Sequence, residues 1–260
     1  MAEENLEQGI QRTAAQLRLQ LAQMTAASQL LERAAFDEKS AGYLAVMNQG
    51  ICRMLRIVGR MELSGRLGGE ASVVKLTPVD LGVLTADLGA RMEGLLARAG
   101  VKLTVRGPER LPARADGELI RQLLLELVAN GAKAGTEVVL TLKRDGDSAV
   151  FTVEDNGPGV SASQLPFLFD SGARELPDWK RGGNGVAIAR RIAALHGGRL
   201  AAVCAPDRGL TVTASIPLNR GGDDALRCPP VEWDRGGFDE AVVGLSHLLP
   251  PGVFAPGEYE

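Results

Sequence analysis

The chain has 260 residues, of which 45% are hydrophobic, and its 29 Lys and Arg against 32 Asp and Glu give a formal net charge of -3. Because the acids and bases are interspersed, composition argues against nucleic acid or an anionic membrane as the partner and leaves proteins and small molecules. The polar N-terminus, the lack of a long apolar run and the three scattered cysteines (Cys52, Cys204 and Cys228) indicate a cytoplasmic protein without a membrane segment, disulfide framework or zinc site.

Residues 1–70 are expected to form a helical hairpin that serves as a dimerisation domain. Apolar or small residues recur there at alternating steps of four and three, the spacing of a coiled-coil seam. They are Ile10, Ala14, Leu17, Leu21, Met24, Ser28, Leu31 and Ala35, and then Leu44, Met47, Ile51, Met54, Val58 and Met61. Two such hairpins would bury all four seams in a dimeric four-helix bundle, so the pattern favours a homodimer. The alternative is one hairpin packed on the rest of a monomer.

Strands and helices mix in a second domain, residues 71–219. Alternation predicts strands at 72–81, 101–107, 137–144, 149–155, 199–205 and 209–218, and amphipathic periodicity predicts helices at 81–100, 116–133 and 185–198. Two strands should form a hairpin around Asp145, Gly146 and Asp147. Helices beside a mainly antiparallel sheet predict an α+β fold, a two-layer sandwich.

Residues 220–260 form a third region, a C-terminal tail rich in Gly, Pro and charge. It nevertheless holds several large apolar residues: Val231, Trp233, Phe238, Leu245, Leu248, Leu249 and Phe254. Because the segment is this apolar, it is expected to dock on another surface. Its target could be the neighbouring domain, a partner chain or another protein.

Three polar side chains share one face of the predicted helix at 116–133. Glu126 and Asn130 are four residues apart and Lys133 is three further on. A carboxylate near the buried side is costly unless something such as a metal or a water satisfies it. A solvated polar stripe is the alternative interpretation.

Two glycine-containing turns follow. In the first, Asp155 ends a strand, and Gly157 and Gly159 allow a flat ligand to approach the backbone closely, so the carboxylate could accept from an exocyclic amine. An ordinary turn would also explain this sequence. In the second, a loop with Gly183 and Gly185 runs into a helix, where free N–H groups and the helix dipole favour phosphate.

In this order, the three segments resemble the N, G1 and G2 boxes of the GHKL superfamily, the Bergerat-fold ATPases. The resemblance implies ATP and Mg²⁺ as cofactors. It implies that Asn130 holds Mg²⁺, Asp155 reads the adenine amine, and Gly157, Gly159, Gly183 and Gly185 shape the nucleotide site. Lys133 would lie near the phosphates, and Glu126 stands where some branches carry the base that activates water. Phe169 resembles the F-box Phe, with a lid at 171–182.

The helix after the second glycine loop and the N-terminal hairpin resemble the sensor histidine kinase branch in particular. Such a kinase needs an accessible imidazole on its hairpin, and the first 70 residues contain no histidine. The chain has two histidines: His196 at a helix end, where capping is expected, and His247 in the tail. Because the hairpin has no histidine, autophosphorylation at the usual hairpin site is excluded.

A second departure from the family is Arg181, which stands in place of the first G2 glycine.

The leading hypothesis is a histidine-kinase-like signalling protein of two-component type, whose output is conformational or slow ATP hydrolysis. Its protein partner, a response regulator or another signalling protein, is unknown. The alternative is a binding module, either an ATP-sensing scaffold or an anti-sigma-like regulator. A serine kinase of the anti-sigma type is a third hypothesis, against which the long hairpin argues.

Overall fold

The computed structural model describes residues 2–32, 37–68, 74–161, 185–204, 209–219, 234–235 and 238–256. The chain divides into two compact units, Met1–Ser72 with Val231–Glu260, and Val73–Pro230. Within the described ranges, no helix is long and apolar enough to cross a membrane. The expected domain boundaries near residues 70 and 220 lie beside or among residues outside these ranges, and they stay predictions.

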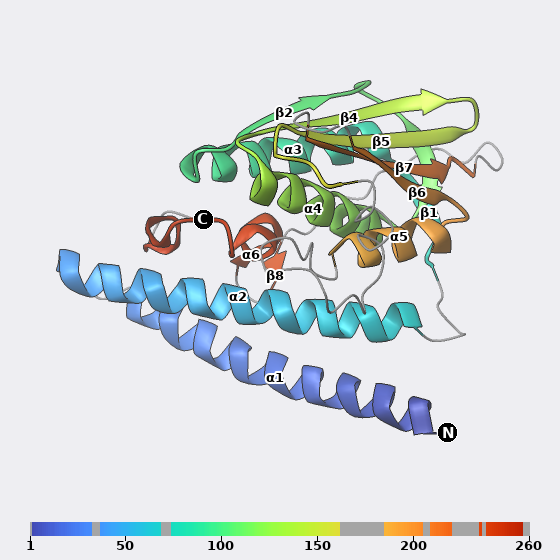
Figure 1. Ribbon diagram of the computed structural model, residues 1–260. Coiled ribbons are helices and arrows are strands. Elements are labelled where there is room, and N and C mark those ends of the chain that lie inside the picture. Colours follow the sequence, from blue (N-terminus) through green and yellow to red (C-terminus); the bar gives the residue numbers. More distant parts are fainter. Residues whose placement is uncertain are drawn as a thin grey trace. The chain divides into compact units, whose positions relative to one another are not determined.

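The larger unit is a two-layer α+β sandwich, as the sequence predicted (Figure 1). Its five-stranded sheet has the order β2-β4-β5-β7-β6, and β2 and β4 are its one parallel pair. The strands are β2 (Lys102–Arg106), β4 (Glu137–Asp145), β5 (Ser148–Asp155), β6 (Arg199–Cys204) and β7 (Leu210–Pro217). The helices are α3 (Leu81–Arg98), α4 (Gly117–Ala134) and α5 (Gly185–Leu195), and they cover one face of the sheet.

Alternation along the strands separates the two faces of this sheet. Leu140 and Leu142 on β4 are buried with Phe151 on the neighbouring β5, whereas the intervening Thr141 and Thr152 are partly exposed. Because successive side chains point to opposite faces, the first set packs under the helices and the second lies on the helix-free face. The turn between β4 and β5 contains Gly146 at φ 54, a left-handed conformation that glycine adopts readily.

A small second sheet corrects one expectation. The strand expected at 72–81 is limited to β1 (Thr77–Asp80), which pairs antiparallel with β3 (Pro112–Ala115), a strand that the sequence did not predict. Among the described residues, β1 pairs with β3 alone, and β3 is four residues long, so β1 has hydrogen-bonding partners over four residues and is shorter than expected. The sequence Pro-Ala-Arg-Ala of β3 lacks the β-branched and aromatic residues that mark strands.

The smaller unit is built on the helical hairpin of α1 (Ala2–Glu32) and α2 (Glu38–Gly68). The predicted seam splits into two rows in the single chain. One row is buried, and its members are Ala14, Leu21, Ser28, Leu44, Ile51 and Val58. The other row is exposed by more than a third, and its members are Leu17, Met24, Leu31, Met47 and Met54. Half of the apolar seam is therefore left without a partner within the part of the unit that the structure describes.

The C-terminal segment belongs to the same unit as the hairpin. It forms β8 (Asp234–Arg235), β9 (Phe238–Asp239), α6 (Glu240–Leu245) and a 3-10 turn, η2 (Pro251–Phe254). Two α2 side chains donate to its carbonyls: Asn48 Nδ2 to Phe254 O (3.2 Å) and Gln49 Nε2 to Leu249 O (2.7 Å). The docking target that the sequence left open is thus α2 of the hairpin for this part of the tail.

Candidate functional site

The three polar residues predicted on one helical face lie along α4, at increasing exposure. Glu126 is 3% exposed, and its Oε1 accepts a hydrogen bond from Gln122 Nε2 at 3.0 Å, one turn earlier. Asn130 is half-buried, and in the described part of the chain its buried Nδ2 has no hydrogen-bond partner. Lys133 is exposed. A buried amide without a partner is costly, so α4 presents an amide that a bound group would satisfy.

Asp155 ends β5, as predicted, and only one of its two carboxylate oxygens accepts hydrogen bonds from the described residues. Its Oδ1 accepts from Gly157 N (2.9 Å) and from Leu210 N (3.3 Å), whereas Oδ2 accepts no hydrogen bond from the residues that the structure describes. Burial raises the pKa of this carboxyl, and the two backbone donors offset only part of that effect. A donor placed at Oδ2 would therefore relieve a partly desolvated charge.

Glycines bring three backbone segments close to Asp155. A Cβ on Gly131 of α4 would lie 3.5 Å from Asp155 Cβ, and a Cβ on Gly157 would lie 2.9 Å from Asp155 Oδ1 and 2.7 Å from Ala134 O. Gly209, which precedes β7, has φ +78, and a Cβ there would collide with Asp155 O. Side chains at these positions would fill the space around the carboxylate. The predicted Gly159 has φ +66, which explains a glycine there.

Two residues that the sequence did not single out hold the turn after Asp155. Asn156 Oδ1 accepts from the backbone N–H groups of Thr136 and Glu137, both at 2.9 Å, which ties the turn to the start of β4. Cys204 Sγ accepts from Val160 N at 3.0 Å. Asn156 could have been noticed as an Asx residue at a turn, whereas the cysteine gives no sequence signal for this contact.

The second glycine segment lies only partly within the described residues. Gly185 is buried as the first residue of α5, which packs against α4. Gly183, Arg181, Phe169 and the expected lid at 171–182 lie outside the described residues. The structure therefore brings α4 together with the end of β5 and packs α5 against α4.

His196 has a structural place, as expected, although its contacts go beyond capping. The residue is 4% exposed; its Nε2 accepts from Asp116 N at 3.1 Å, and its Nδ1 lies 2.9 Å from Ile192 O. Since a carbonyl only accepts, this arrangement assigns the proton to Nδ1. Both ring nitrogens are occupied, so this imidazole is not available as a nucleophile.

Residues 115–220 match the family model described as "Histidine kinase-, DNA gyrase B-, and HSP90-like ATPase". The circadian input-output histidine kinase CikA of Synechocystis sp. is 34% identical over 110 residues, which are 40% of this chain and 15% of that protein. The sensor protein SphS of Synechococcus elongatus is 30% identical over 155 residues, 55% of this chain and 38% of that protein. The chain thus spans well under half the length of these curated relatives.

Solved structures of histidine kinases share the fold. The full-length ShkA structure in complex with AMPPNP aligns with a TM-score of 0.67 at 23% identity, over 82% of this chain and 46% of that one. The Acinetobacter baumannii histidine kinase AdeS aligns with a TM-score of 0.52 at 15% identity, over 78% of this chain and 96% of that one. At these identities the likeness concerns the fold alone.

Proposed function

Because residues 115–220 belong to the histidine kinase-, DNA gyrase B- and HSP90-like ATPase family, we propose that this chain binds Mg²⁺-ATP in a histidine-kinase-like, two-component type of signalling protein. The observation that carries the proposal is the half-used, partly buried carboxylate of Asp155, surrounded by backbone rather than side chains. Such a group favours a flat ligand that donates an N–H, as the adenine amine does.

The proposed metal end of the site is on α4. The amide oxygen of Asn130 would hold Mg²⁺, as the resemblance implies. Its buried Nδ2, which has no partner among the described residues, is a donor that an acceptor such as a phosphate oxygen would satisfy. Mg²⁺ would neutralise phosphate charge when bound. The exposed Lys133, one turn on, would contribute a cation near the phosphates, and Gly183 and Gly185 would supply backbone N–H groups for them.

Glu126 is the proposed base for hydrolysis. It is buried and held by Gln122, so its position is fixed, and a fixed carboxylate can orient and deprotonate a water. The first 70 residues contain no histidine, so the proposed output is conformational change or slow ATP hydrolysis rather than phosphorylation of the hairpin. A second candidate is a scaffold that binds ATP without turnover, which the same absence favours.

Calorimetry of Mg²⁺-ATP binding on the wild type and Asp155→Asn tests the proposal. Asn keeps an acceptor for Gly157 N and Leu210 N but replaces the carboxylate oxygen that would face the amine, so we expect binding at least about tenfold weaker. Asp147→Asn, a change at the exposed β4–β5 turn, is the matched control and should bind like the wild type. Absence of wild-type binding at millimolar ATP would contradict the proposal.

Phosphate release from the same samples separates the ATPase from the scaffold. Glu126→Gln preserves the acceptor for Gln122 and removes the base, so turnover should stop while ATP affinity stays within about threefold. If the wild type binds ATP and releases no phosphate, the scaffold is the better description.

We also propose that the hairpin pairs with a second copy of the chain. The exposed row on α1 and α2, which includes Leu17, Met24 and Met54, repeats every seven residues beside a buried row with the same period. Burying such a row in a four-helix bundle removes apolar surface from water at about 25 cal/mol per Å².

Light scattering after size exclusion tests this pairing. Met24→Glu places a charge in the exposed row and should shift the mass from about two chains toward one. Leu19→Glu is the control, because Leu19 is 60% exposed on α1 but lies off the heptad row. Equal masses for the two variants would count against a dimer through this row.

A further inference from the structure

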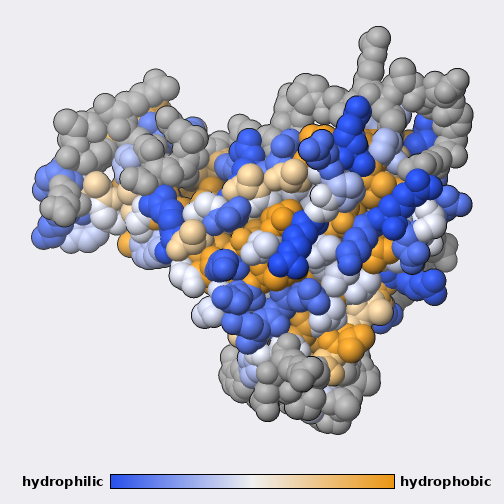
Figure 2. Space-filling model, turned by 90° about the horizontal axis from the view of Figure 1, so that it is seen from above, coloured by the Kyte–Doolittle hydropathy of each residue, from blue (hydrophilic) through white to orange (hydrophobic). Residues whose placement is uncertain are grey.

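The larger unit has a cleft at the end of β2, on the helix-free face of its sheet. Its volume is about 710 Å³, within the range of small-molecule sites. Pro108 and Pro112, in and at the end of the loop that follows β2, contribute apolar surface, whereas the lining residues Leu111 and Leu142 are 3% and 1% exposed. On the side of the molecule seen from above, hydrophilic and hydrophobic residues are interspersed (Figure 2). A cleft with apolar walls on such a surface can accept an amphiphilic ligand.

Cations from three stretches of chain line this cleft. They are Arg106 at the end of β2, Arg110 in the following loop, and Lys143 and Arg144 on β4; Glu154 is the acid among the lining residues. These four bases and one acid give the lining a net formal charge of +3. Arg144 Nε donates to Gly146 O at 2.9 Å and its Nη2 lies 3.9 Å from Asp147 Oδ1, so both ends of this guanidinium face the β4–β5 turn. The other three cations are the main candidates for a ligand, and of these Arg110 is held, within the described residues, through Nε alone.

Arg106 and Lys143 face the same side of the sheet. Arg106 pairs with Thr141 across β2 and β4, and Lys143 is two residues beyond Thr141, so alternation places all three on the helix-free face. Among the described residues, neither cation has a carboxylate within ion-pair distance. Two cations that have no ion-pair partner among the described residues, in a cleft with a single acid, Glu154, favour an anionic ligand.

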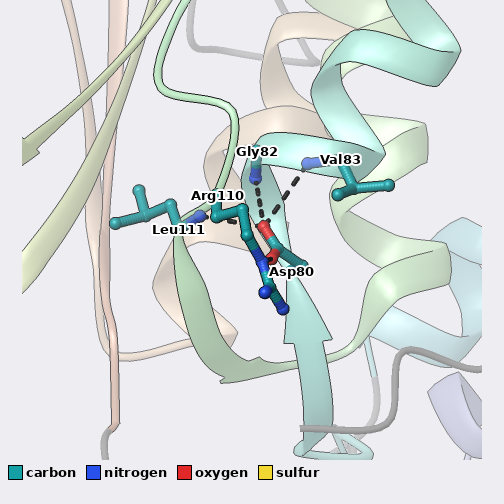
Figure 3. A network of polar contacts seen from close by, with 5 residues as sticks. All are labelled: Asp80, Gly82, Val83, Arg110 and Leu111. Atoms are coloured by element: carbon teal, nitrogen blue, oxygen red, sulfur yellow. Dashed lines mark hydrogen bonds and ion pairs between the residues drawn. The ribbon is translucent and has the colours of Figure 1, made fainter.

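A buried aspartate holds the loop that forms the other wall (Figure 3). Asp80 Oδ1 accepts from Leu111 N at 2.8 Å, and Oδ2 accepts from Arg110 Nε at 3.1 Å. The Asp80 side chain is 1% exposed and the Arg110 side chain 69% exposed, so the pair anchors Arg110 by Nε while much of its side chain faces solvent. Gly107 fits the same loop against β4, since a Cβ there would lie 3.1 Å from Leu142 Cβ.

We propose that this cleft binds a small organic phosphate, with the phosphate on Arg106, Arg110 and Lys143 and an apolar or aromatic body against Pro108 and Pro112. Arginine forks and a lysine ammonium suit phosphate oxygens, and the apolar surface accounts for the organic part. The loop wall is fixed before binding, which lowers the ordering cost.

This site is separate from the proposed ATP site. Asp155 has the same parity along β5 as the buried Val153 and lies on the helix side of the sheet, whereas Glu154 of the cleft points to the other side. Loss of ATP binding and loss of phosphate binding in the cleft are therefore independent outcomes.

Phenyl phosphate, which combines an aromatic ring with a phosphate dianion, is the probe. Amide chemical shifts of the full chain, followed during titration, should show saturable binding at about 1 mM or tighter, with the largest changes at Gly107, Leu111 and Leu142. Inorganic phosphate should bind at least threefold more weakly, because it leaves the apolar wall uncovered.

The double variant Arg106→Gln/Lys143→Gln should weaken phenyl phosphate binding at least tenfold. Arg199→Gln, which removes an exposed arginine from β6 at the far edge of the same sheet, should leave it unchanged. Equal affinity in the double variant and the wild type, absence of saturation, or shifts confined to α4 and the end of β5 would each overturn the site. Inorganic phosphate binding as tightly as phenyl phosphate would overturn the organic part of the assignment.

Discussion

Two aspartates of the larger unit end strands and are withdrawn from solvent, yet their surroundings differ in kind. Asp80, at the end of β1, uses both carboxylate oxygens: three backbone N–H groups donate to Oδ1 and Arg110 pairs with Oδ2. Asp155, at the end of β5, uses Oδ1 alone within the described residues. The pKa of Asp80 is therefore lowered and the pKa of Asp155 is raised.

At Asp80, burial raises the pKa, but the donors from Leu111, Arg110, Val83 and Gly82 outweigh it, so the pKa falls below its ordinary value. At Asp155, burial outweighs two donors and the pKa rises. A fully satisfied carboxylate stabilises the fold, whereas a carboxylate kept short of donors is costly without a ligand. The difference assigns Asp80 to structure and makes Asp155 the better candidate for binding.

The largest expected effect is on the structural side of this comparison. Asp80→Ala removes the N-cap of α3 and leaves Gly82 N, Val83 N and Leu111 N without their acceptor, so the larger unit should lose about 2–4 kcal/mol of unfolding free energy. Urea denaturation measures this loss. Asp87→Ala, at an exposed position of the same helix, should change stability by less than about 0.5 kcal/mol. A loss below 1 kcal/mol for Asp80→Ala would break the comparison.

At Asp155, removing the charge is expected to leave the unfolding free energy unchanged or to increase it, the opposite of the loss expected for Asp80→Ala. The raised folded-state pKa of Asp155 means that its contribution to stability is present below the unfolded pKa and is lost as pH rises through the folded pKa. At neutral pH, Asp155→Asn should therefore leave the free protein as stable as the wild type, or more stable by up to about 1 kcal/mol, because solvent reaches part of the group. That gain should shrink as the pH falls through the folded pKa.

Asp80 provides the reverse control in the same acid titration. Its pKa is lowered, so its contribution is present above the unfolded pKa and is lost as pH falls through the folded pKa. Thermal unfolding of the wild type and both variants between neutral and acid pH measures the two trends. A clear destabilisation by Asp155→Asn at neutral pH would mean that its carboxylate is structural as well.

The two aspartates also mark how far sequence carries the interpretation. Asp155 could be found because it stands at the end of an alternating strand, before two glycines and after the helix of Glu126 and Asn130. Asp80 was missed although it precedes a predicted helix, the place of an N-cap. Its bond to Leu111 N spans 31 residues, and nothing local in the sequence indicates such a contact.

The fold shows the same division between local and distant signals. The helices, the hairpin around Gly146 and the α+β class follow from periodicity and turn residues. The contact of the C-terminal segment with Asn48 and Gln49 on α2 depends on side chains that bond main-chain carbonyls some 200 residues away, as the sequence separations of 206 and 200 show. Main-chain carbonyls carry no residue identity, so the apolar composition of the tail predicted docking but not its target.

The smallest expected effect sharpens the comparison through one glycine on the helix beside each aspartate. Gly94 lies on α3, which Asp80 caps, and a Cβ there would meet nothing within 4 Å; a Cβ on Gly131 of α4 would lie 3.3 Å from the methyls of Val138. Gly94→Ala should stabilise the larger unit by about 0.5–1 kcal/mol, since alanine is the better helix former.

Gly131→Ala has the same helix gain, but its Cβ would be tight against the Val138 methyls and would need a small displacement of α4 from β4, so its net stability change should be smaller than that of Gly94→Ala. Because the displacement moves Asn130 relative to Asp155, ATP affinity should fall about three- to tenfold in Gly131→Ala and stay unchanged in Gly94→Ala. Chemical denaturation and calorimetry measure the two quantities on the same samples. Equal gains in stability with unchanged ATP affinity would show that the contact between α4 and Val138 accommodates the added methyl without moving Asn130.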